Sequence, residues 1–309
     1  MYYTVPPQDG RRFIVTGANS GTGREAARRL ALAGAEVVLA VRSLEKGDEA
    51  KAAILREAPT ALLDVRLLDL ANLASIRAFA ASIVEDGRPL HCLVNNAGVM
   101  IPPHRYETAD GFELQFGTNF LGPFTVTNLL LPVLLATPGA RVVTMSSTAA
   151  NFGRIDFSDL NWRTRTYSAA RAYAQSKLAD LLLGRHLAII AHERGWDLLS
   201  TTAHPGITRT NLMTAGRNLG RDAGAQLAPV RHTIIPSQGV EIGAEPLLFA
   251  ATSPEAKQGA YYGPSRLALV GPTHEAGIPR AARSADVAAR LWDEAEKLTG
   301  VALPATATS

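Results

Sequence analysis

The chain has 309 residues, of which 47% are hydrophobic and 19% charged, and its formal net charge is +3. This length suits one large α/β domain or two small ones, and the composition is typical of a protein with a substantial core. The small net charge and the absence of a dense basic tract argue against a nucleic-acid partner. The single cysteine, Cys92, excludes an intramolecular disulfide and a multi-cysteine metal site, so we expect no metal.

The sequence also carries no clear signal for secretion or for a membrane anchor. The N-terminal residues MYYTVPPQDGRR lack the apolar core of a secretion signal. The most apolar window, TVTNLLLPVLLATPGA, is interrupted by Pro132. We therefore expect a cytoplasmic protein with no membrane partner.

Short apolar runs alternate with longer helical stretches through the first two thirds of the chain, which indicates a parallel sheet with crossover connections. Because the runs are continuously apolar, both faces of the sheet are expected to be covered. We predict one doubly wound α/β domain over residues 1–309, with a mostly seven-stranded parallel sheet and helices on both faces. The expected strands are RFIVTG, AEVVLAV, DVRLLDL, HCLVNNAG, ARVVTMSS, DLLSTTAHPG and GAYYGP, and the expected helices lie near 22–33, 45–57, 73–84, 112–136, 169–193 and 241–252.

The stretch RFIVTGANSGTGREAARRLALAG reads as a strand, a glycine turn and a helix. The unpaired N–H groups and positive dipole end of such a helix hold a pyrophosphate. Gly17, Gly21 and Gly23 are predicted to form the turn and to let phosphates approach bare backbone. Asn19 and Ser20 either assist at the phosphate or only shape the turn.

The position that selects between NAD and NADP carries a basic residue. Many folds that bind NAD place an acid about 20 residues after the glycine turn, and here Arg42 stands near that position. An arginine can pair with a 2′-phosphate, so we predict that NADP(H) is preferred over NAD(H). The alternative is a solvated arginine at a strand-to-helix turn.

Two further strand ends are expected to meet the cofactor. Asp69 ends the run DVRLLDL at the carboxyl edge of the sheet, where it either contacts adenine or caps the next helix. The small residues of the next strand end, Asn96, Ala97 and Gly98, allow the cofactor to pack against backbone; the alternative is a polar turn.

Tyr173 and Lys177 lie four residues apart, and residues at this spacing share one face of a helix. An ammonium beside a phenol favours the phenolate and lowers the pKa of the tyrosine. Such a tyrosine is able to transfer a proton near neutral pH. The alternative is a surface tyrosine packed over a lysine stem.

TGANSGTG, NNAG, Asn119, Ser147, Tyr-x-x-x-Lys and HPG, in this order, resemble the short-chain dehydrogenase/reductase superfamily over roughly residues 10–265. The arginine after the second strand, the serine pair and HPG are similar to the retinol-dehydrogenase and carbonyl-reductase-like branch. The resemblance implies a Rossmann-type fold and an NADP(H)-dependent enzyme that transfers a hydride between nicotinamide and a small-molecule carbonyl or alcohol.

Carried over by position, the resemblance also implies roles for single residues. Tyr173 is the general acid/base, Lys177 lowers its pKa and bonds the nicotinamide ribose, and Ser147 polarises the carbonyl. Asn119 holds a helix irregularity and a water of the proton relay. The predicted cofactor contacts are Gly17, Asn19, Ser20, Gly21, Thr22, Gly23, Arg42, Asp69, Leu70, Asn96, Ala97, Gly98, Tyr173, Lys177, Pro205, Gly206, Ile207 and Thr210, of which the last four approach the carboxamide.

Some features depart from this pattern. Thr22 replaces the usual aliphatic residue of the turn, which we expect to loosen the packing there. The 26-residue separation of Ser147 and Tyr173 implies an insertion near 150–168, which covers the substrate or blocks the helix pairing that relatives use for dimers. A homodimer and a monomer therefore both remain open. We also expect a variable substrate loop near 207–240 and a flexible tail near 301–309.

Several residues have competing interpretations. Tyr167 is a rival proton donor, disfavoured because Arg171 replaces the partner lysine. Trp162 is either a lid or a core residue, and His204 is expected to be structural. Arg217 and Arg221 either meet an anionic substrate or are solvated.

The functional alternatives on the same fold are a reductase of an activated C=C bond and a non-catalytic NADP-binding regulatory protein. Reductases of the first kind that are similar to this family carry an active-site cysteine between the asparagine and tyrosine positions. This chain has no cysteine there. A sugar-nucleotide epimerase or dehydratase is disfavoured by the glycine spacing.

Overall fold

In the computed structural model, which describes residues 3–220 and 236–304, a single eight-stranded sheet forms the centre of the protein. The strand order is β3-β2-β1-β4-β5-β6-β7-β8, in which the first seven strands are parallel and β8 is antiparallel to β7. The prediction of a mostly parallel, doubly wound sheet is confirmed. The strands are β1 (Arg12–Thr16), β2 (Glu36–Val41), β3 (Leu63–Leu67), β4 (Cys92–Asn95), β5 (Ala140–Met145), β6 (Leu198–Ala203), β7 (Tyr261–Arg266) and β8 (Val270–Glu275).

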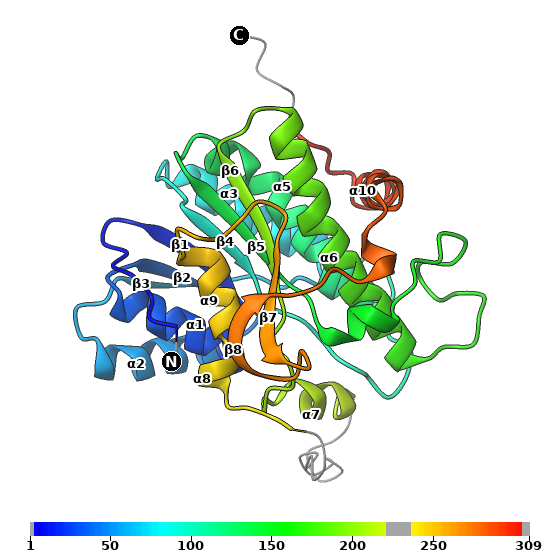
Figure 1. The fold of residues 1–309 in the computed structure, drawn as a ribbon, viewed down its shortest axis with the longest axis horizontal. Coiled ribbons are helices and arrows are strands. Elements are labelled where there is room, and N and C mark those ends of the chain that lie inside the picture. The colour runs from blue at the N-terminus through cyan, green and yellow to red at the C-terminus, as the bar shows by residue number, and fades with distance from the viewer. Residues whose placement is uncertain (1–2, 221–235, 305–309) are drawn as a thin grey trace.

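Helices cover both faces of this sheet (Figure 1). One layer consists of α1, α2 and α9, and the other of α3, α5 and α6, with α10 packed against α6. The main helices are α1 (Gly21–Leu32), α2 (Leu44–Glu57), α3 (Leu73–Glu85), α5 (Gly122–Leu135), α6 (Ala169–Glu193), α9 (Glu245–Thr252) and α10 (Ala285–Thr299). Shorter ones are α4 (Leu114–Phe116), α7 (Leu212–Arg217), α8 (Val240–Gly243), the π-helix η1 (Gly117–Leu121) and the 3₁₀ helices η2 (Thr148–Phe152) and η4 (Arg280–Ala282).

Two elements were missed by the sequence reasoning. Strand β8 has mostly exposed or half-exposed residues and contains Pro272, so its sequence lacks the alternation of a buried strand, and the proline is tolerated because β8 is an edge strand. Helix α10 carried a readable signal: Ser284 caps its start, Gly300 ends it with φ of +63°, and Leu291 and Trp292 lie on a buried stripe.

The expected helix over 112–136 is present but interrupted. Residues Gly117–Leu121 form a π-helix between α4 and α5, and Asn119 lies within it. This is the helix irregularity that the resemblance implies. Among the described residues, Leu114–Leu135 is long and apolar enough to cross a membrane by length and composition, but 78% of its most apolar window is buried inside the fold.

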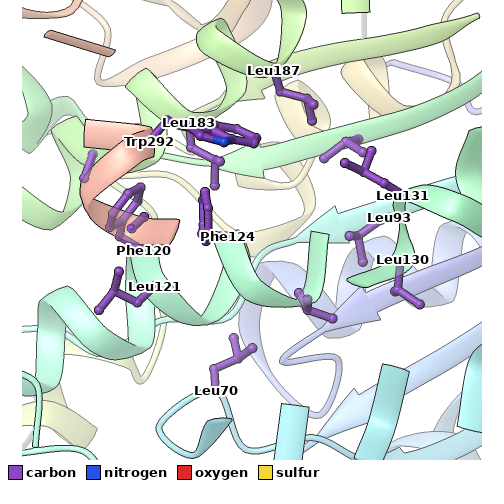
Figure 2. Close-up of a cluster of buried hydrophobic side chains, with 14 of the residues drawn as sticks. Leu70, Leu93, Phe120, Leu121, Phe124, Leu130, Leu131, Leu183, Leu187 and Trp292 are labelled. Atoms are coloured by element: carbon purple, nitrogen blue, oxygen red, sulfur yellow. The ribbon is translucent and has the colours of Figure 1, made fainter. Parts of the chain in front are cut away.

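Helix α5 packs in the centre of one core, as Figure 2 shows for its aromatic and leucine side chains. The ring of Phe124 meets that of Trp292 of α10 edge to face at 4.9 Å between centroids. Leu130 and Leu131 lie on the side of the same helix toward Leu93 of β4. This packing fixes α5, and with it the π-helix that precedes it, against the sheet.

Helix α6 lies close against the sheet because small residues occur at its contacts. A side chain at Gly184 would collide with Thr202 of β6, and one at Gly153, just after η2, would collide with the backbone of Ala174. Close contacts on both sides therefore hold the helix that carries Tyr173 and Lys177.

The insertion near 150–168 is a closely hydrogen-bonded segment beside the N-terminal half of α6 (Figure 1). The carboxylate of Asp159 accepts bonds from the backbone N–H groups of Arg163, Thr164 and Arg165, at 2.7 to 3.2 Å. Although burial alone opposes ionisation, these donors lower the pKa of Asp159 to about 2. The ionised form of this carboxylate therefore stabilises the insertion.

We predict that Asp159→Asn lowers the free energy of unfolding by about 1–2 kcal/mol at neutral pH, because a charged acceptor of several hydrogen bonds is lost. The pKa of Asp159 is depressed in the folded state, so its contribution is complete above the unfolded value of about 3.9 and is lost as pH falls toward 2. Urea unfolding of the wild type and of Asp159→Asn should be measured at a series of pH values. The difference between their free energies of unfolding should become smaller as the pH falls from about 3.9 toward 2. Asp48→Asn, an exposed position on α2, is the control and should show no comparable loss.

Candidate functional site

A cleft of about 1500 Å³ opens at the carboxyl ends of the parallel strands. It lies where the strand order reverses, between β1 and β4, which is the usual ligand position in open α/β sheets. Its volume exceeds the roughly 300–1,000 Å³ of pockets for single drug-sized ligands. The predicted residues that line it are Gly17, Asn19, Ser20, Gly21, Thr22, Arg42, Asp69, Leu70, Asn96, Ala97, Gly98, Ser147, Tyr173, Lys177, Pro205, Gly206, Ile207 and Thr210.

The glycine turn forms one end of this cleft. Gly17 and Gly21 adopt φ of +68° and +55°, which side-chain-bearing residues rarely adopt. Gly23 lies below the turn, where a side chain would collide with the amide of Asn96 and the carbonyl of Gly17. The turn therefore exposes backbone at the N-terminus of α1, an arrangement that suits a phosphate group.

The expectation that Thr22 loosens the packing of the glycine turn is wrong, because its side chain is hydrogen-bonded. Its hydroxyl donates to the Asn96 side-chain oxygen at 2.8 Å, and the Asn96 amide donates to the Thr16 carbonyl at 2.9 Å. The hydroxyl of Thr16 also accepts from the backbone of Asn96 and Ala97. A polar network thus joins the glycine turn to the end of β4.

Three cations that follow β1 and β2 in the chain line the cleft. Arg42 is exposed directly after the strand, and Arg24 of α1 and Lys46 of α2 also line the cleft, together with Glu49. Within residues 3–220 and 236–304, none of the three cations forms an ion pair with a carboxylate at 4 Å or less. Arg24 and Lys46 were missed from the sequence, although both stand in the first turn of a helix that follows a predicted strand.

Asp69 lines the cleft and is not the cap of the next helix. Its Oδ1 accepts from the backbone N–H of Ala71 at 3.0 Å, whereas Asn72 caps α3 by accepting from Ala74 and Ser75. Leu70 lies against α5, where a side chain at Gly122 would come within 2.7 Å of its carbonyl oxygen.

Helix α6 places Tyr173 and Lys177 in the same cleft, and both side chains are mostly buried. The Lys177 ammonium donates to the Met145 carbonyl at 3.0 Å and to Asp180 Oδ2 at 2.7 Å. Burial opposes the charged form, but Asp180 and Tyr173 outweigh it, so the pKa of Lys177 is raised.

Ser147 and Asn119 approach this pair from two other elements. Ser147 lines the cleft at the start of η2, where its Oγ accepts from the Ala149 N–H at 3.2 Å. Asn119 does not line the cleft. Its side chain exchanges two hydrogen bonds with the backbone of Val99 and donates to Ser176 Oγ at 2.9 Å, so it joins the segment after β4 to α6.

The loop after β6 closes the cleft on the other side. Gly206 has φ of +62° and packs against the Leu269 carbonyl, which accepts from the Ile207 N–H at 2.8 Å. The Pro205 carbonyl accepts from the Gln238 amide at 2.9 Å. Thr210 extends to the glycine turn, where a side chain at Gly21 would be 3.4 Å from its methyl group.

Three other candidates from the sequence, Tyr167, Trp162 and His204, do not line the cleft. The hydroxyl of Tyr167 donates to Glu113 at 2.8 Å and does not line the cleft; burial and Glu113 raise its pKa. Trp162 is buried against Tyr167 and therefore packs in the core of the insertion. Burial lowers the pKa of His204 to about 4, and its Nδ1 accepts from Gly206, which agrees with the expected structural role.

The two arginines of the loop after β6 are placed less fully. Arg217 ends α7 and does not line the cleft, and Arg221 lies outside the described residues, as does much of the predicted loop 207–240 and the tail after residue 304. Cys92 is buried in β4, and burial raises the pKa of its thiol to about 12, as expected for a packing residue.

Six apolar side chains that the sequence did not single out also line the cleft, and we call them the apolar wall. Its most exposed member is Phe152 of η2, with 86% of its surface accessible. These side chains come from four separate segments, so no sequence spacing relates them. They are Met100, Ile101, Leu114, Phe152, Leu212 and Leu219.

Known proteins resemble the chain over nearly its whole length. It is 40% identical to human (Homo sapiens) retinol dehydrogenase 13 over 307 residues, which cover 97% of this chain and 87% of that protein. It is 41% identical to mouse (Mus musculus) polyprenol dehydrogenase, with coverage of 96% and 86%.

Solved structures share the fold. An uncharacterised protein from Mycobacterium paratuberculosis matches with a TM-score of 0.80 and 38% identity, over 99% of this chain and all of that one. A short chain dehydrogenase from Burkholderia cenocepacia, crystallised in complex with NADP, matches with a TM-score of 0.61 and 25% identity, over 82% and 95%. The family model described as short chain dehydrogenase matches residues 11–218, which places Gly17, Ser147, Tyr173 and Lys177 within it. The chain belongs to the short-chain dehydrogenase/reductase family, in its retinol-dehydrogenase-like branch.

Proposed function

We propose that this protein is an NADP(H)-dependent oxidoreductase that interconverts an alcohol and its carbonyl compound. The observation that carries the proposal is that Tyr173, Lys177 and Ser147 line the same cleft as the glycine turn. The glycine turn suits a dinucleotide because Gly17 and Gly21 expose backbone at the start of α1. When bound there, the nicotinamide supplies or accepts the hydride.

The residues of the chain divide the remaining work. Tyr173 delivers a proton to the carbonyl oxygen in reduction and removes it from the alcohol in oxidation. The Lys177 ammonium stabilises the phenolate and offers a donor to the ribose. The Ser147 hydroxyl donates to the substrate oxygen, where negative charge develops in the transition state.

Asn119 supports these groups from behind. Its hydrogen bonds to Val99 and Ser176 hold the π-helix, the end of β4 and α6 together. We infer that it preserves the path by which a proton reaches Lys177 and Tyr173 from solvent.

Three cations that line the cleft favour NADP(H) over NAD(H). Arg42, Arg24 and Lys46 line the cleft without a carboxylate ion-pair partner among the described residues, and the 2′-phosphate is the anion that distinguishes the two cofactors. The NADP complex of the related Burkholderia cenocepacia protein agrees with this preference.

The apolar wall supports a hydrophobic substrate. Phe152, Leu212 and Leu219 offer apolar surface in the cleft and little to pair with a charged group. The relatives named for retinol and polyprenol also point to a long apolar alcohol or aldehyde. The cytoplasmic location stays a prediction.

Replacing the proton donor tests the proposal directly. Tyr173→Phe should lower turnover by roughly 10²–10⁴-fold, because positioned acid/base catalysis contributes about that factor. The measurement is NADPH consumption with a panel of aldehydes, ketones and enones. Tyr167→Phe, which removes a hydroxyl outside the cleft, is the matched control and should retain activity. Equal turnover in wild type and Tyr173→Phe would reject the assignment, and turnover of enones alone would favour C=C reduction.

Removing one cation tests the cofactor preference. Arg42→Ala should raise the KM for NADPH by roughly tenfold to a hundredfold and change that for NADH little, because a charge-assisted hydrogen bond contributes about 1.5–3 kcal/mol. Arg56→Ala, in the last turn of α2, is the control. A wild-type enzyme that binds NADH more tightly than NADPH, with Arg42→Ala unchanged, would contradict the preference.

Truncating the exposed aromatic tests the substrate class. Phe152→Ala should raise the KM for long apolar alcohols by roughly tenfold or more while leaving short alcohols unaffected, because buried apolar area is lost only with the long chains. Leu267→Ala removes an equally exposed side chain that does not line the cleft, so it should leave both KM values unchanged. An equal effect on short and long alcohols would rule out the apolar wall as the substrate site.

A further inference from the structure

Lys177 is part of a buried ion pair that the expected catalytic set does not include. Its ammonium lies 2.7 Å from Oδ2 of Asp180, one turn farther along α6. The Lys177 side chain is 5% exposed and that of Asp180 is 1% exposed. The ion pair therefore lies in the interior, directly behind the cleft that Lys177 lines.

The second oxygen of this carboxylate has no evident structural use. Within the described residues, Asp180 Oδ1 is buried and has no hydrogen-bond partner. A buried carboxylate with an unsatisfied oxygen is costly to the fold. Burial raises the pKa of Asp180, and the Lys177 ammonium acts against that shift, so the ionised form of this carboxylate depends on the ammonium that it faces.

The electrostatic surroundings of the ammonium are simple. The titratable groups that act on it are Asp180 and Tyr173, both on α6, and these two in turn help to raise the pKa of Tyr261 of β7. The other elements packed nearby contribute neutral groups, namely the Met145 carbonyl, Ser146 and Asn119. Among the described residues, Asp180 is thus the carboxylate that offsets the cost of burying this charge.

We infer that Asp180 is a positioning residue, the counter-ion that keeps Lys177 charged and directed along the cleft. Two of the three N–H donors of the ammonium are held by Met145 and Asp180, which leaves the third for the cleft. Without Asp180, burial would favour the neutral amine, and the group that stabilises the Tyr173 phenolate would be lost at alkaline pH. This catalytic consequence rests on the proposed function, whereas the charge state of Lys177 does not.

The charge of Lys177 is directly measurable because the chain has only five lysines, Lys46, Lys51, Lys177, Lys257 and Lys297. The full-length protein without cofactor is labelled with ¹³C at the lysine ε-carbons and titrated by NMR, and Lys177→Arg assigns the signal. In wild type, Lys177 should stay charged to at least the pH at which the other four lysines titrate. In Asp180→Asn, its midpoint should fall by roughly one pH unit or more.

Matched variants separate loss of the counter-ion from loss of a buried carboxylate in general. Asp180→Glu should restore the midpoint toward the wild-type value. Glu113→Gln removes a carboxylate of similar burial that contacts Tyr167 and no lysine, so it should leave the Lys177 midpoint unchanged. An unchanged midpoint in Asp180→Asn overturns the inference. If Asp180→Asn does not fold, the wild type decides: a Lys177 midpoint well below those of the other four lysines also overturns the inference.

The pH profile of alcohol oxidation supplies the catalytic readout. In Asp180→Asn, kcat/KM should decline on the alkaline side with the midpoint seen by NMR, whereas wild type and Asp180→Glu keep their plateau. A uniform loss at all pH values would indicate a merely structural role and overturn the positioning assignment. Absence of any turnover in wild type would reject the proposed function but leave the NMR result to decide the charge of Lys177.

Discussion

The site depends on the connection between helix α6 and the end of strand β5. The Lys177 ammonium donates to the Met145 carbonyl, and the Ser146 hydroxyl donates in the opposite direction to the Lys177 carbonyl at 2.7 Å. Because backbone atoms of the strand take part, the position of the lysine is set by the sheet rather than by a mobile loop. The same connection places Tyr173, one turn earlier on the same helix, and Ser147, which follows Ser146 after the end of the strand.

Close packing makes this connection available. Gly184 and Gly153 let α6 approach the sheet and η2 more closely than any side chain would allow. On the other side, the π-helix redirects Asn119 toward Val99 and Ser176. Interiors packed at this density have few alternative arrangements, so Tyr173, Lys177 and Ser147 are held in place before any ligand enters.

The two ends of the cleft are built on different physical grounds. The nucleotide end uses exposed backbone, a helix N-terminus and three cations, which suit phosphates. The apolar wall uses side chains from α4, η2, α7 with the residues just after it, and the segment after β4, which suit a hydrocarbon. The insertion contributes Phe152 near its start. Its other residues are hydrogen-bonded to one another through Asp159, and Tyr167 bonds Glu113, the N-cap residue of α4.

The sequence alone predicted the succession of the parallel strands and main helices along the chain, the glycine turn and the Tyr173–Lys177 pair, because these depend on local spacing and on apolar periodicity. Asn119 and Ser147 were identified from the motifs that resemble the family. It missed β8, whose polar residues carry no strand pattern, and it missed α10 although the caps and apolar stripe were readable. Only the tertiary structure decided three contacts between side chains: Thr22 donates a hydrogen bond to Asn96, Tyr167 donates one to Glu113, and Lys177 donates one to Asp180. The apolar wall likewise needed coordinates, because its members are distant in the chain and meet only when the strands bring their loops to one edge.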